Sequence, residues 1–406
     1  MKPKANHDQR PAVVVVGLDC ITGLQTARVF ARRGVQVVGV ASDPKHFCCR
    51  TRACSRVISA DINGPELIER LMETGPSFAR KPVLVPCTDN SVLQISKDRG
   101  ALSAFYRMAL PVAGTIERLI DKVQFSHFAE ENGLPTPRSA TLTSLEEAGQ
   151  AATQINFPAV LKPDLKTVRW VHQTKEKAVV VNSAEELIRA VKQCLCWCDA
   201  LLLQEWIPGP IENHYTCDAY FDAQSQPLVT YTSQKLRQWP PMTGVGSISA
   251  DCDNPAVRQQ AIRLFQAAGY HGLAYVEMKR HELTGEYLIV EPNVGRPTGR
   301  SACAEATGVE MLYTMYCDLA GLPLPAARQQ KFTGKTWIYW KRDLHAAWWG
   351  MRAGDLTFSG WVRSIRGCKT CAVFCWRDPV PFFADWLRIG KQIKTAAGKR
   401  GAMSGS

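Results

Sequence analysis

The chain has 406 residues, of which 46% are hydrophobic and 21% charged, and a formal net charge of +12. This length is too great for one ordinary core and predicts two or three domains, and the composition is globular rather than disordered. No apolar run reaches the roughly 18 residues of a membrane helix, and the polar start predicts no signal peptide. The 15 cysteines are odd in number and irregularly spaced, so we expect reduced thiols and a cytoplasmic protein.

The first domain is expected over residues 1–114 as a small, doubly wound, parallel α/β sheet. The turn after its first strand reads GLDCITG, which does not match the G-x-G-x-x-G spacing, so an NAD-dependent dehydrogenase is disfavoured. The segment 87–90 (CTDN) follows a strand at its carboxyl end, where such sheets place ligands. Apolar strands are predicted at 12–17, 35–40, near Val57 and at 83–86, alternating with helices at 24–33, 65–74 and 90–96.

Two lysines stand out in the middle of the chain. Lys122 lies at the start of a predicted amphipathic helix, and Lys162 ends a short apolar strand at 159–161. A lysine at the end of a buried strand needs a partner, and a phosphate is a suitable one. A further strand at 201–203 leads into the sequence QEWIPG, whose backbone and apolar side chains suit an adenine ring.

A pair of acids marks the strand ends farther along the chain. The strand predicted at 287–290 ends in Glu291, with Asn293 two residues on, so both side chains point the same way. A preceding strand at 273–278 carries Glu277, which predicts an antiparallel hairpin with one acid on each strand. Hard oxygen ligands of this kind suit Mg²⁺. A plain surface hairpin is disfavoured, because an unpaired charge at the end of an apolar run is costly.

Two arginines follow the hairpin. Arg296 and Arg300 lie in a Gly/Pro loop and suit a bidentate clamp on a carboxylate or a phosphate.

Taken in order, these motifs resemble the ATP-grasp superfamily over roughly residues 115–321. The resemblance implies two α+β lobes that clasp ATP, over residues 115–333, with the first lobe at 115–205 and the second at 206–333. A preceding α/β domain of the expected kind is present. The implied roles are phosphate contacts for Lys122 and Lys162, adenine binding for Gln204, Glu205, Trp206 and Ile207, ribose binding for Glu212, and two Mg²⁺ ions (or Mn²⁺) on Glu277, Glu291 and Asn293.

The VEPNVGRPTGR sequence is most similar to the carboxylate–amine ligase branch, of which D-aspartate ligases are members. That branch implies activation of a carboxylate as an acyl phosphate, followed by attack of an amine. Arg296 or Arg300 would then stabilise the acyl phosphate or hold the substrate carboxylate. Lys235 or Arg237, beyond a strand that carries Asp218, would help bind the acyl phosphate, unless these strands form a surface hairpin with solvated charges.

The sequence departs from the superfamily pattern in two places. The segment 164–177, where a glycine-rich lid is usual, contains no glycine, although Lys166, Arg169, Lys175 and Lys177 would supply charge. Gly295 stands where the commoner E-x-N-P-R form has its arginine. The alternative function is therefore a degenerate nucleotide-binding module with a scaffolding or regulatory role.

The C-terminal extension, residues 334–406, is basic and rich in tryptophan. Residues 321–406 contain 15 Lys and Arg, four Asp and no Glu, together with seven of the 11 tryptophans. A helix with Phe383, Trp386, Leu387 and Ile393 opposite Arg388, Lys391 and Lys394 is predicted near the end. Three interpretations stay open: a packed helical appendage, peripheral docking on an anionic membrane, or nucleic-acid binding, for which no motif appears. The expected substrates are small-molecule or lipid-linked carboxylates and amines, whose identity the sequence does not specify.

Cysteine clusters offer an alternative metal site. Cys368, Cys371 and Cys375 lack a convincing fourth ligand, and Cys194, Cys196 and Cys198 form a second cluster, so buried thiols are expected. The isolated histidines His172, His214 and His271 are predicted to be structural.

Overall fold

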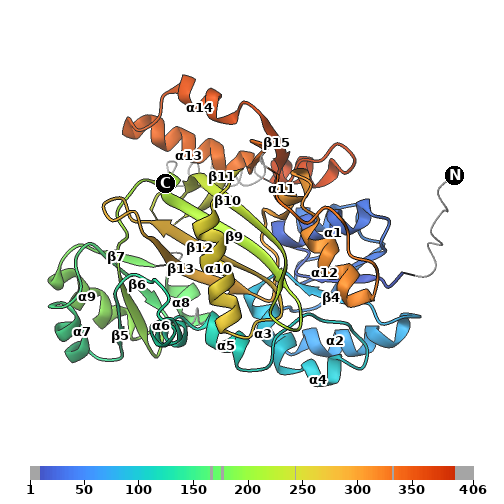
Figure 1. Ribbon diagram of the computed structural model, residues 1–406, viewed down its shortest axis with the longest axis horizontal. Helices are drawn as coiled ribbons and strands as arrows, with labels where there is room; N and C mark the ends of the chain where they lie inside the picture. The colour runs from blue at the N-terminus through green and yellow to red at the C-terminus, as the bar shows by residue number, and fades with distance from the viewer. Residues whose placement is uncertain (1–9, 165–167, 175–177, 243, 332, 389–406) are drawn as a thin grey trace, which may run out of the picture.

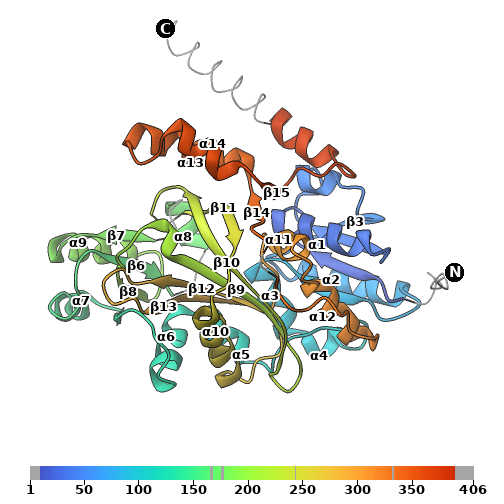
Figure 2. The ribbon, with the colours of Figure 1, turned by 45° about the horizontal axis from the view of Figure 1, so that its top comes forward.

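The computed structural model describes residues 10–164, 168–174, 178–242, 244–331 and 333–388, which contain three β-sheets (Figures 1 and 2). One sheet belongs to the N-terminal domain, one to the first lobe, and the third has seven strands and lies between them and the C-terminal helices. Among the helices that the structure describes, none combines the length and the apolar character that a membrane crossing requires.

The N-terminal sheet is parallel, with the strand order β3-β2-β1-β4. Its central strands are apolar and buried, because helices cover both faces of a parallel sheet. α1 packs on one face together with α11 and α12, and α2, α3 and α4 pack on the other. The elements of this domain are β1 (Val13–Val16), α1 (Ile21–Arg32), β2 (Val37–Ala41), η2 (Phe47–Arg50), β3 (Arg56–Ser59), α2 (Glu66–Thr74), η3 (Gly75–Ser77), β4 (Val83–Pro86), α3 (Asp89–Lys97) and α4 (Arg99–Leu102).

The glycines of the GLDCITG turn have a packing role. Gly17 has a φ of +90°, which favours glycine, and a Cβ on Gly23 would lie only 2.2 Å from the carbonyl oxygen of Gly17. The start of α1 therefore packs directly on the turn that follows β1. This contact accounts for both glycines without a dinucleotide.

The sheet of the first lobe is antiparallel, with the order β5-β8-β6-β7. Leu187 and Val191 of α9 and Ala148 of α7 are buried in its apolar core. The elements are α5 (Thr115–Ile120), α6 (Lys122–Glu131), β5 (Ser139–Leu142), α7 (Leu145–Ala151), β6 (Ala159–Pro163), α8 (Val168–Gln173), β7 (Val179–Val181), α9 (Ala184–Cys194) and β8 (Leu201–Glu205).

The seven-stranded sheet has the order β13-β12-β9-β10-β11-β14-β15. Its pairs are antiparallel except β14 with β15, which run parallel. The elements of this part are η4 (Ile211–Asn213), β9 (His214–Phe221), β10 (Pro227–Trp239), β11 (Val245–Asp251), α10 (Pro255–Ala267), β12 (Gly272–Arg280), β13 (Tyr287–Val294), α11 (Ser301–Ala306), α12 (Met311–Ala320), β14 (Thr336–Ile338), α13 (Trp340–Ala353), α14 (Phe358–Ile365) and β15 (Cys368–Cys371), and residues 380–388 are also helical.

The two faces of this sheet differ in chemistry. Cys217, Ala219 and Phe221 of β9 and Val276 and Met278 of β12 point to one face, where they pack in one core with α10. The residues between them are mostly polar and point to the opposite face. Figure 2 shows α10 below the sheet and α13 and α14 above it, with the first lobe and the N-terminal domain on either side.

The predicted fold class is confirmed: a parallel α/β domain precedes two α+β lobes. The predicted hairpin is also confirmed, although β13 continues past Glu291 to Val294. The C-terminal extension differs from a simple helical appendage, because β14 and β15 are strands of the seven-stranded sheet. The predicted helix near the end is seen at 380–388, and Lys391, Ile393 and Lys394 lie outside the described residues.

Candidate active site

The centre of the site is the pair of acids on the β12–β13 hairpin. Glu277 and Glu291 are direct cross-strand partners, and Asn293 lies opposite Tyr275 one step along the same face. The Glu277 carboxylate lies 3.6 Å from Lys235 Nζ. The hairpin thus presents two carboxylates and an amide side by side.

The loop after β13 connects this hairpin to the N-terminal domain. Gly295 has a φ of +72°, and a Cβ there would lie 2.6 Å from Val92 Cγ1 on α3. Its backbone N–H donates to Tyr270 Oη at 2.6 Å. Glycine is required because the chain turns against α3 here, which explains why the arginine of the commoner motif comes one residue later.

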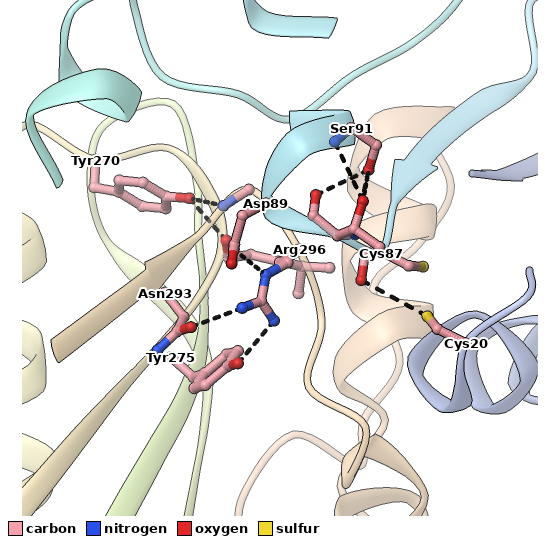
Figure 3. Close-up of polar contacts among 11 residues, drawn as sticks. Cys20, Cys87, Asp89, Ser91, Tyr270, Tyr275, Asn293 and Arg296 are labelled. Carbon is pink, nitrogen blue, oxygen red and sulfur yellow. Dashed lines mark hydrogen bonds and ion pairs between the residues drawn. The ribbon is translucent and has the colours of Figure 1, made fainter. Parts of the chain in front are cut away.

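Arg296 has contacts on all three of its nitrogen atoms. It donates from Nε to Asp89, from Nη1 to Tyr275 Oη at 2.7 Å, and from Nη2 to Asn293 Oδ1 at 2.7 Å (Figure 3). Asp89 begins α3 in the CTDN segment, near Cys87 and Ser91 in the same view. Arg296 therefore holds Asn293 in place and ties it to the N-terminal domain.

Arg300 is buried and has donor capacity to spare. Its Nη2 donates to Thr216 Oγ1 at 2.9 Å and lies 3.9 Å from Glu277. Its Nε is buried, and no partner for it exists in the described part of the chain. This unused donor distinguishes Arg300 from Arg296.

Asp218 lies on β9 opposite Tyr275, fully buried. Neither of its carboxylate oxygens has a hydrogen-bond partner among the described residues. Burial raises the pKa of Asp218 to about 7; Arg300 works against this rise and Glu277 adds to it.

Positive side chains from both lobes affect the pKa of His214. Burial, together with the charges of Lys235, Lys279 and Lys162, lowers the pKa of His214 to about 3, whereas Glu277 opposes this shift. Lys162 belongs to β6 of the first lobe, and the other two lysines belong to the seven-stranded sheet. Charges from both lobes therefore act on this one imidazole.

The predicted phosphate lysines have neighbours within the first lobe. Lys162 Nζ donates to Gln204 Oε1 at 2.7 Å, and Lys122 Nζ donates to the Asp164 carbonyl oxygen at 3.3 Å. The side chain of Glu205 faces elsewhere, because its Oε1 accepts from the backbone N–H and the side-chain Nδ2 of Asn156. Gln204 is thus on the side of Lys162, and Glu205 is not.

Lys279 fixes the segment that links the two lobes. Its Nζ donates to the Ile207 carbonyl oxygen at 2.6 Å and lies 5.0 Å from the centre of the Trp206 ring. Burial lowers the pKa of Lys279 to about 8, although Glu282 opposes this effect. Glu212, the predicted ribose ligand, is exposed in η4.

The glycine-free segment is partly helical. α8 forms within it, Arg169 Nη1 donates to the Cys196 carbonyl oxygen at 3.1 Å, and the buried Trp170 meets Trp197 edge-on. Lys166, Lys175 and Lys177, which were expected to supply positive charge, lie outside the described part of the chain.

Some expectations need correction, and some residues were missed. Arg237, the stated alternative to Lys235, is paired with Asp343 at 2.8 Å and faces the C-terminal helices. The pKa of His214, which was predicted to be structural, is lowered by burial and by three lysines, and one of these, Lys279, was not singled out in the sequence. The polar alternation of 214, 216 and 218 along β9 was the available sequence signal.

The structure tests the alternative metal site on cysteines only in part. In the ranges that the structure covers, no group of three or more His, Cys, Asp or Glu side chains is arranged to hold a metal ion. The magnesium set predicted above contains only two acids and completes its ligands with an amide. Cys375 Sγ accepts from Arg32 Nη2 at 3.3 Å, and the side chain of Cys368 lies outside the described part of the chain.

Comparison with known proteins adds the family. No family model matches the chain. It is 28% identical over 269 residues to the D-aspartate ligase of Enterococcus faecium, and the match covers 61% of this chain and 63% of the relative. It is 22% identical over 325 residues to the N-terminal section of the carbamoyl phosphate synthase large chain of Methanopyrus kandleri, and that match covers 78% of this chain and 56% of the relative. The chain thus spans less than two thirds of the length of these curated relatives.

Solved structures show the same fold. The biotin carboxylase domain of the 2-oxoglutarate carboxylase of Hydrogenobacter thermophilus, in complex with MgADP, ADP and bicarbonate, matches with a TM-score of 0.62 at 17% identity over 80% of this chain and 73% of that one. The L-amino acid ligase of Bacillus licheniformis matches with a TM-score of 0.60 at 16% identity over 79% and 77%. The fold and these similarities identify the chain as a member of the ATP-grasp superfamily.

Proposed function

We propose that the protein is an ATP-dependent ligase that activates a carboxylate as an acyl phosphate and joins it to an amine, releasing ADP and phosphate. The observation that carries this proposal is the juxtaposition of the Glu277–Glu291 pair and Asn293 with Lys235, whose Nζ lies 3.6 Å from the Glu277 carboxylate. Opposite charges arranged in this way suit a metal–triphosphate complex, in which cations meet the acids and phosphates meet the lysines.

The donor set fits magnesium. Glu277 and Glu291 offer carboxylate oxygens from adjacent strands, and Asn293 offers an amide oxygen with a second lone pair beside its bond from Arg296. The Asn293 Nδ2 atom is buried without a partner in the described residues, so the region is built for more polar contacts than it now makes. These three residues would hold two Mg²⁺ ions, or Mn²⁺, which when bound neutralise phosphate charge.

The nucleotide would lie between the lobes. Lys122 and Lys162 would contact its phosphates, and the adenine would rest on the segment from Gln204 to Ile207, which Lys279 fixes through the Ile207 carbonyl. The Glu205 side chain points to Asn156, so the backbone of Glu205, and not its side chain, would bind the adenine. Glu212 would bind the ribose hydroxyls.

The proposed chemistry needs neutralisation of the phosphate charge and exclusion of water from the site. A carboxylate oxygen of the substrate attacks the γ-phosphorus of ATP, the bond to ADP breaks, and an acyl phosphate forms. An amine then attacks the acyl carbon, phosphate leaves, and a proton is lost to give the amide. Lys235 and Arg300 would balance the charge on the transferred group, while Arg296 positions Asn293. Closure of the lobes would protect the acyl phosphate from water.

The test is a screen of acids against amines, with ADP release and amide mass as the measurements. The proposal expects ADP only when Mg²⁺ and a carboxylic acid are both present. The E. faecium relative makes aspartate a sensible first acid.

A nucleotide-binding module without turnover is the second candidate. The observation that favours it is α8, a packed helix in the place of a glycine-rich lid. MgADP binding without ADP release across the whole screen would favour this candidate over the ligase.

We also propose that the C-terminal extension contacts an anionic membrane from the cytoplasmic side. Three of its four aspartates are buried and face internal cations: Asp343 meets Arg237, Asp378 meets Arg28 at 2.8 Å, and Asp385 meets Lys341 at 3.5 Å. These three acids therefore do not neutralise the outer surface, and Asp355 is the exposed one. That surface exposes Arg352, Arg363, Arg366, Arg377 and Arg388 together with Leu344, Trp348, Trp349, Phe358, Trp376, Val380, Phe383, Trp386 and Leu387.

Aromatic side chains beside arginines suit the interface of an anionic bilayer. Sedimentation of the whole protein with vesicles, with and without phosphatidylglycerol, tests this contact. We expect binding only to the anionic vesicles, a loss of binding in a Trp376→Ser, Phe383→Ser double variant, and no loss in Leu283→Ser, which alters an exposed leucine on the β12–β13 turn. Equal sedimentation of all three proteins would contradict the membrane contact.

A further inference from the structure

Arg342, at the start of α13, reaches from the C-terminal extension into the candidate site. Its Nη1 donates to the Gly246 carbonyl oxygen on β11 at 3.0 Å, and its guanidinium lies 5.0 Å from the centre of the Tyr339 ring. Burial lowers the pKa of Arg342, and the charge of Arg300 lowers it too, while Tyr339 opposes them. Two arginines from distant parts of the chain therefore meet at one place.

Its neighbour Asp343 anchors the helix that carries it. Asp343 is fully buried and accepts from Arg237 Nε at 2.8 Å and Nη2 at 2.9 Å, from Ser247 Oγ at 2.9 Å and from Trp361 Nε1 at 3.0 Å. A bidentate buried pair with further donors has one favourable geometry. The first turn of α13 is thus fixed on β10 and β11, and Arg342 is held where it is.

The position between these cations has no side chain. A Cβ on Gly246 would lie 3.4 Å from Arg300 Nη1, 3.5 Å from Ser249 Oγ and 3.6 Å from Lys235 Cγ. Ser249 Oγ and Arg300 Nε are both buried donors without a partner in the described part of the chain. Lys235, Gly246, Ser249, Arg300 and Arg342 together are called the Gly246 site below.

The positive charges of the Gly246 site are unequally balanced. Lys235 and Arg300 lie within 4 Å of Glu277, at the metal end of the site. Arg342 has no ion pair with any acid in the described residues, and the charge of Arg300 acts against its own. A half-buried guanidinium without a counter-charge is costly unless a ligand supplies one.

We propose that the Gly246 site binds a second anionic group of the acid substrate, so that the substrate is a dicarboxylate, an acidic amino acid or a carboxylic acid with a phosphonate-like end. One acidic group is activated near Lys235 and Arg300, and the other is held by Arg342 and Ser249. This inference rests on the proposed ligase function and names its substrate class. The guanidinium group of Arg342 recognises an oxyanion, whether carboxylate or phosphonate.

The test compares matched acids. Succinate and 3-phosphonopropanoate are each compared with butanoate, and aspartate is compared with 2-aminobutanoate, because these analogues have a neutral end. Each reaction contains MgATP and hydroxylamine as the amine, and ADP release is measured. We expect kcat/KM for the doubly acidic compounds to exceed that for their analogues by about 100-fold. Loss of a hydrogen bond to a charged group typically costs about 10- to 100-fold, so Arg342→Gln should reduce the preference by that factor through KM.

Two further variants separate binding from structure. Gly246→Ala adds a methyl group at ordinary contact distance from its neighbours, so it should fold normally and still reduce the preference. Arg189→Gln changes an exposed arginine on α9, outside the Gly246 site, and should leave the preference unchanged. A wild-type preference in both Arg342→Gln and Gly246→Ala would overturn the proposal, as would a greater wild-type activity on the neutral-ended acids.

A binding measurement keeps this inference distinct from the ligase proposal. If no acid yields ADP, thermal denaturation with succinate or butanoate tests the Gly246 site alone. Greater stabilisation by succinate in the wild type, lost in Gly246→Ala, would support the site although the ligase function fails. Equal stabilisation by the two acids would overturn the site as well.

Discussion

The two faces of the seven-stranded sheet differ in the kind of side chain that they bury. On the face toward α10, Phe221, Phe265 and Tyr270 are fully buried and pack ring against ring. On the other face, Asp218 and Arg300 are almost equally buried, yet several of their polar atoms have no partner in the described residues. Apolar burial stabilises a fold, whereas unpaired buried polar groups destabilise it. The comparison teaches that one face holds the protein together and the other is kept ready for ligands.

The largest expected effect is on the polar face. Glu291→Ala removes one proposed metal ligand from an edge strand, and we expect ADP formation to fall by about 10³-fold. The side chain is not part of the apolar core, so the thermal midpoint should stay unchanged. Wild-type ADP release from this variant would remove the metal assignment.

The apolar face should show the reverse. Phe265→Ala leaves a cavity between α10 and the sheet, and we expect it to destabilise the protein by about 3–5 kcal/mol in urea unfolding. ADP release per folded molecule should stay at the wild-type level under stabilising conditions. A large loss of turnover without a loss of stability would break the division between the faces.

Asp218 offers a pH test of the same division. Its pKa rises from 3.8 to about 7 on folding, so the unfolded chain releases this proton at lower pH than the folded one. Its contribution to stability is therefore lost as pH rises from about 4 to about 7, by up to about 4 kcal/mol. Asp218→Asn cannot ionise, and its stability relative to the wild type should increase from pH 5 to pH 8. A difference that does not change with pH would show that Asp218 is ionised throughout.

The smallest effect concerns the anchor of the C-terminal extension. Trp361→Phe removes one of four donor atoms from Asp343, and the bidentate pair with Arg237 remains. We expect a loss of about 1–2 kcal/mol in urea unfolding, with the apolar contacts of the ring retained. A loss as large as that of Phe265→Ala would mean that the anchor depends on the indole itself.

Short-range patterns revealed much of this architecture. The apolar strand at 287–290, the acids around it and the spacing of Glu291 and Asn293 predicted the hairpin and its facing side chains, because strand geometry repeats every two residues. The valine-rich N-terminal strands were predicted for similar reasons. These features depend on neighbours in sequence.

The missed features depend on partners far along the chain. The Arg237–Asp343 pair joins residues 106 positions apart, and no local pattern indicates it. β14 and β15 have their place only because β11 offers an edge, and β15 lies in a cysteine-rich stretch that suggested metal ligands instead. His214 looked isolated because Lys162, Lys235 and Lys279 come from three separate strands.

The most direct test is a crystal structure with MgADP. The account predicts a metal ion on Glu277, Glu291 and Asn293, phosphates between it and Lys162, and adenine at the segment from Gln204 to Ile207. Nucleotide bound elsewhere, or phosphates bound without a metal at these acids, would contradict the proposed active site.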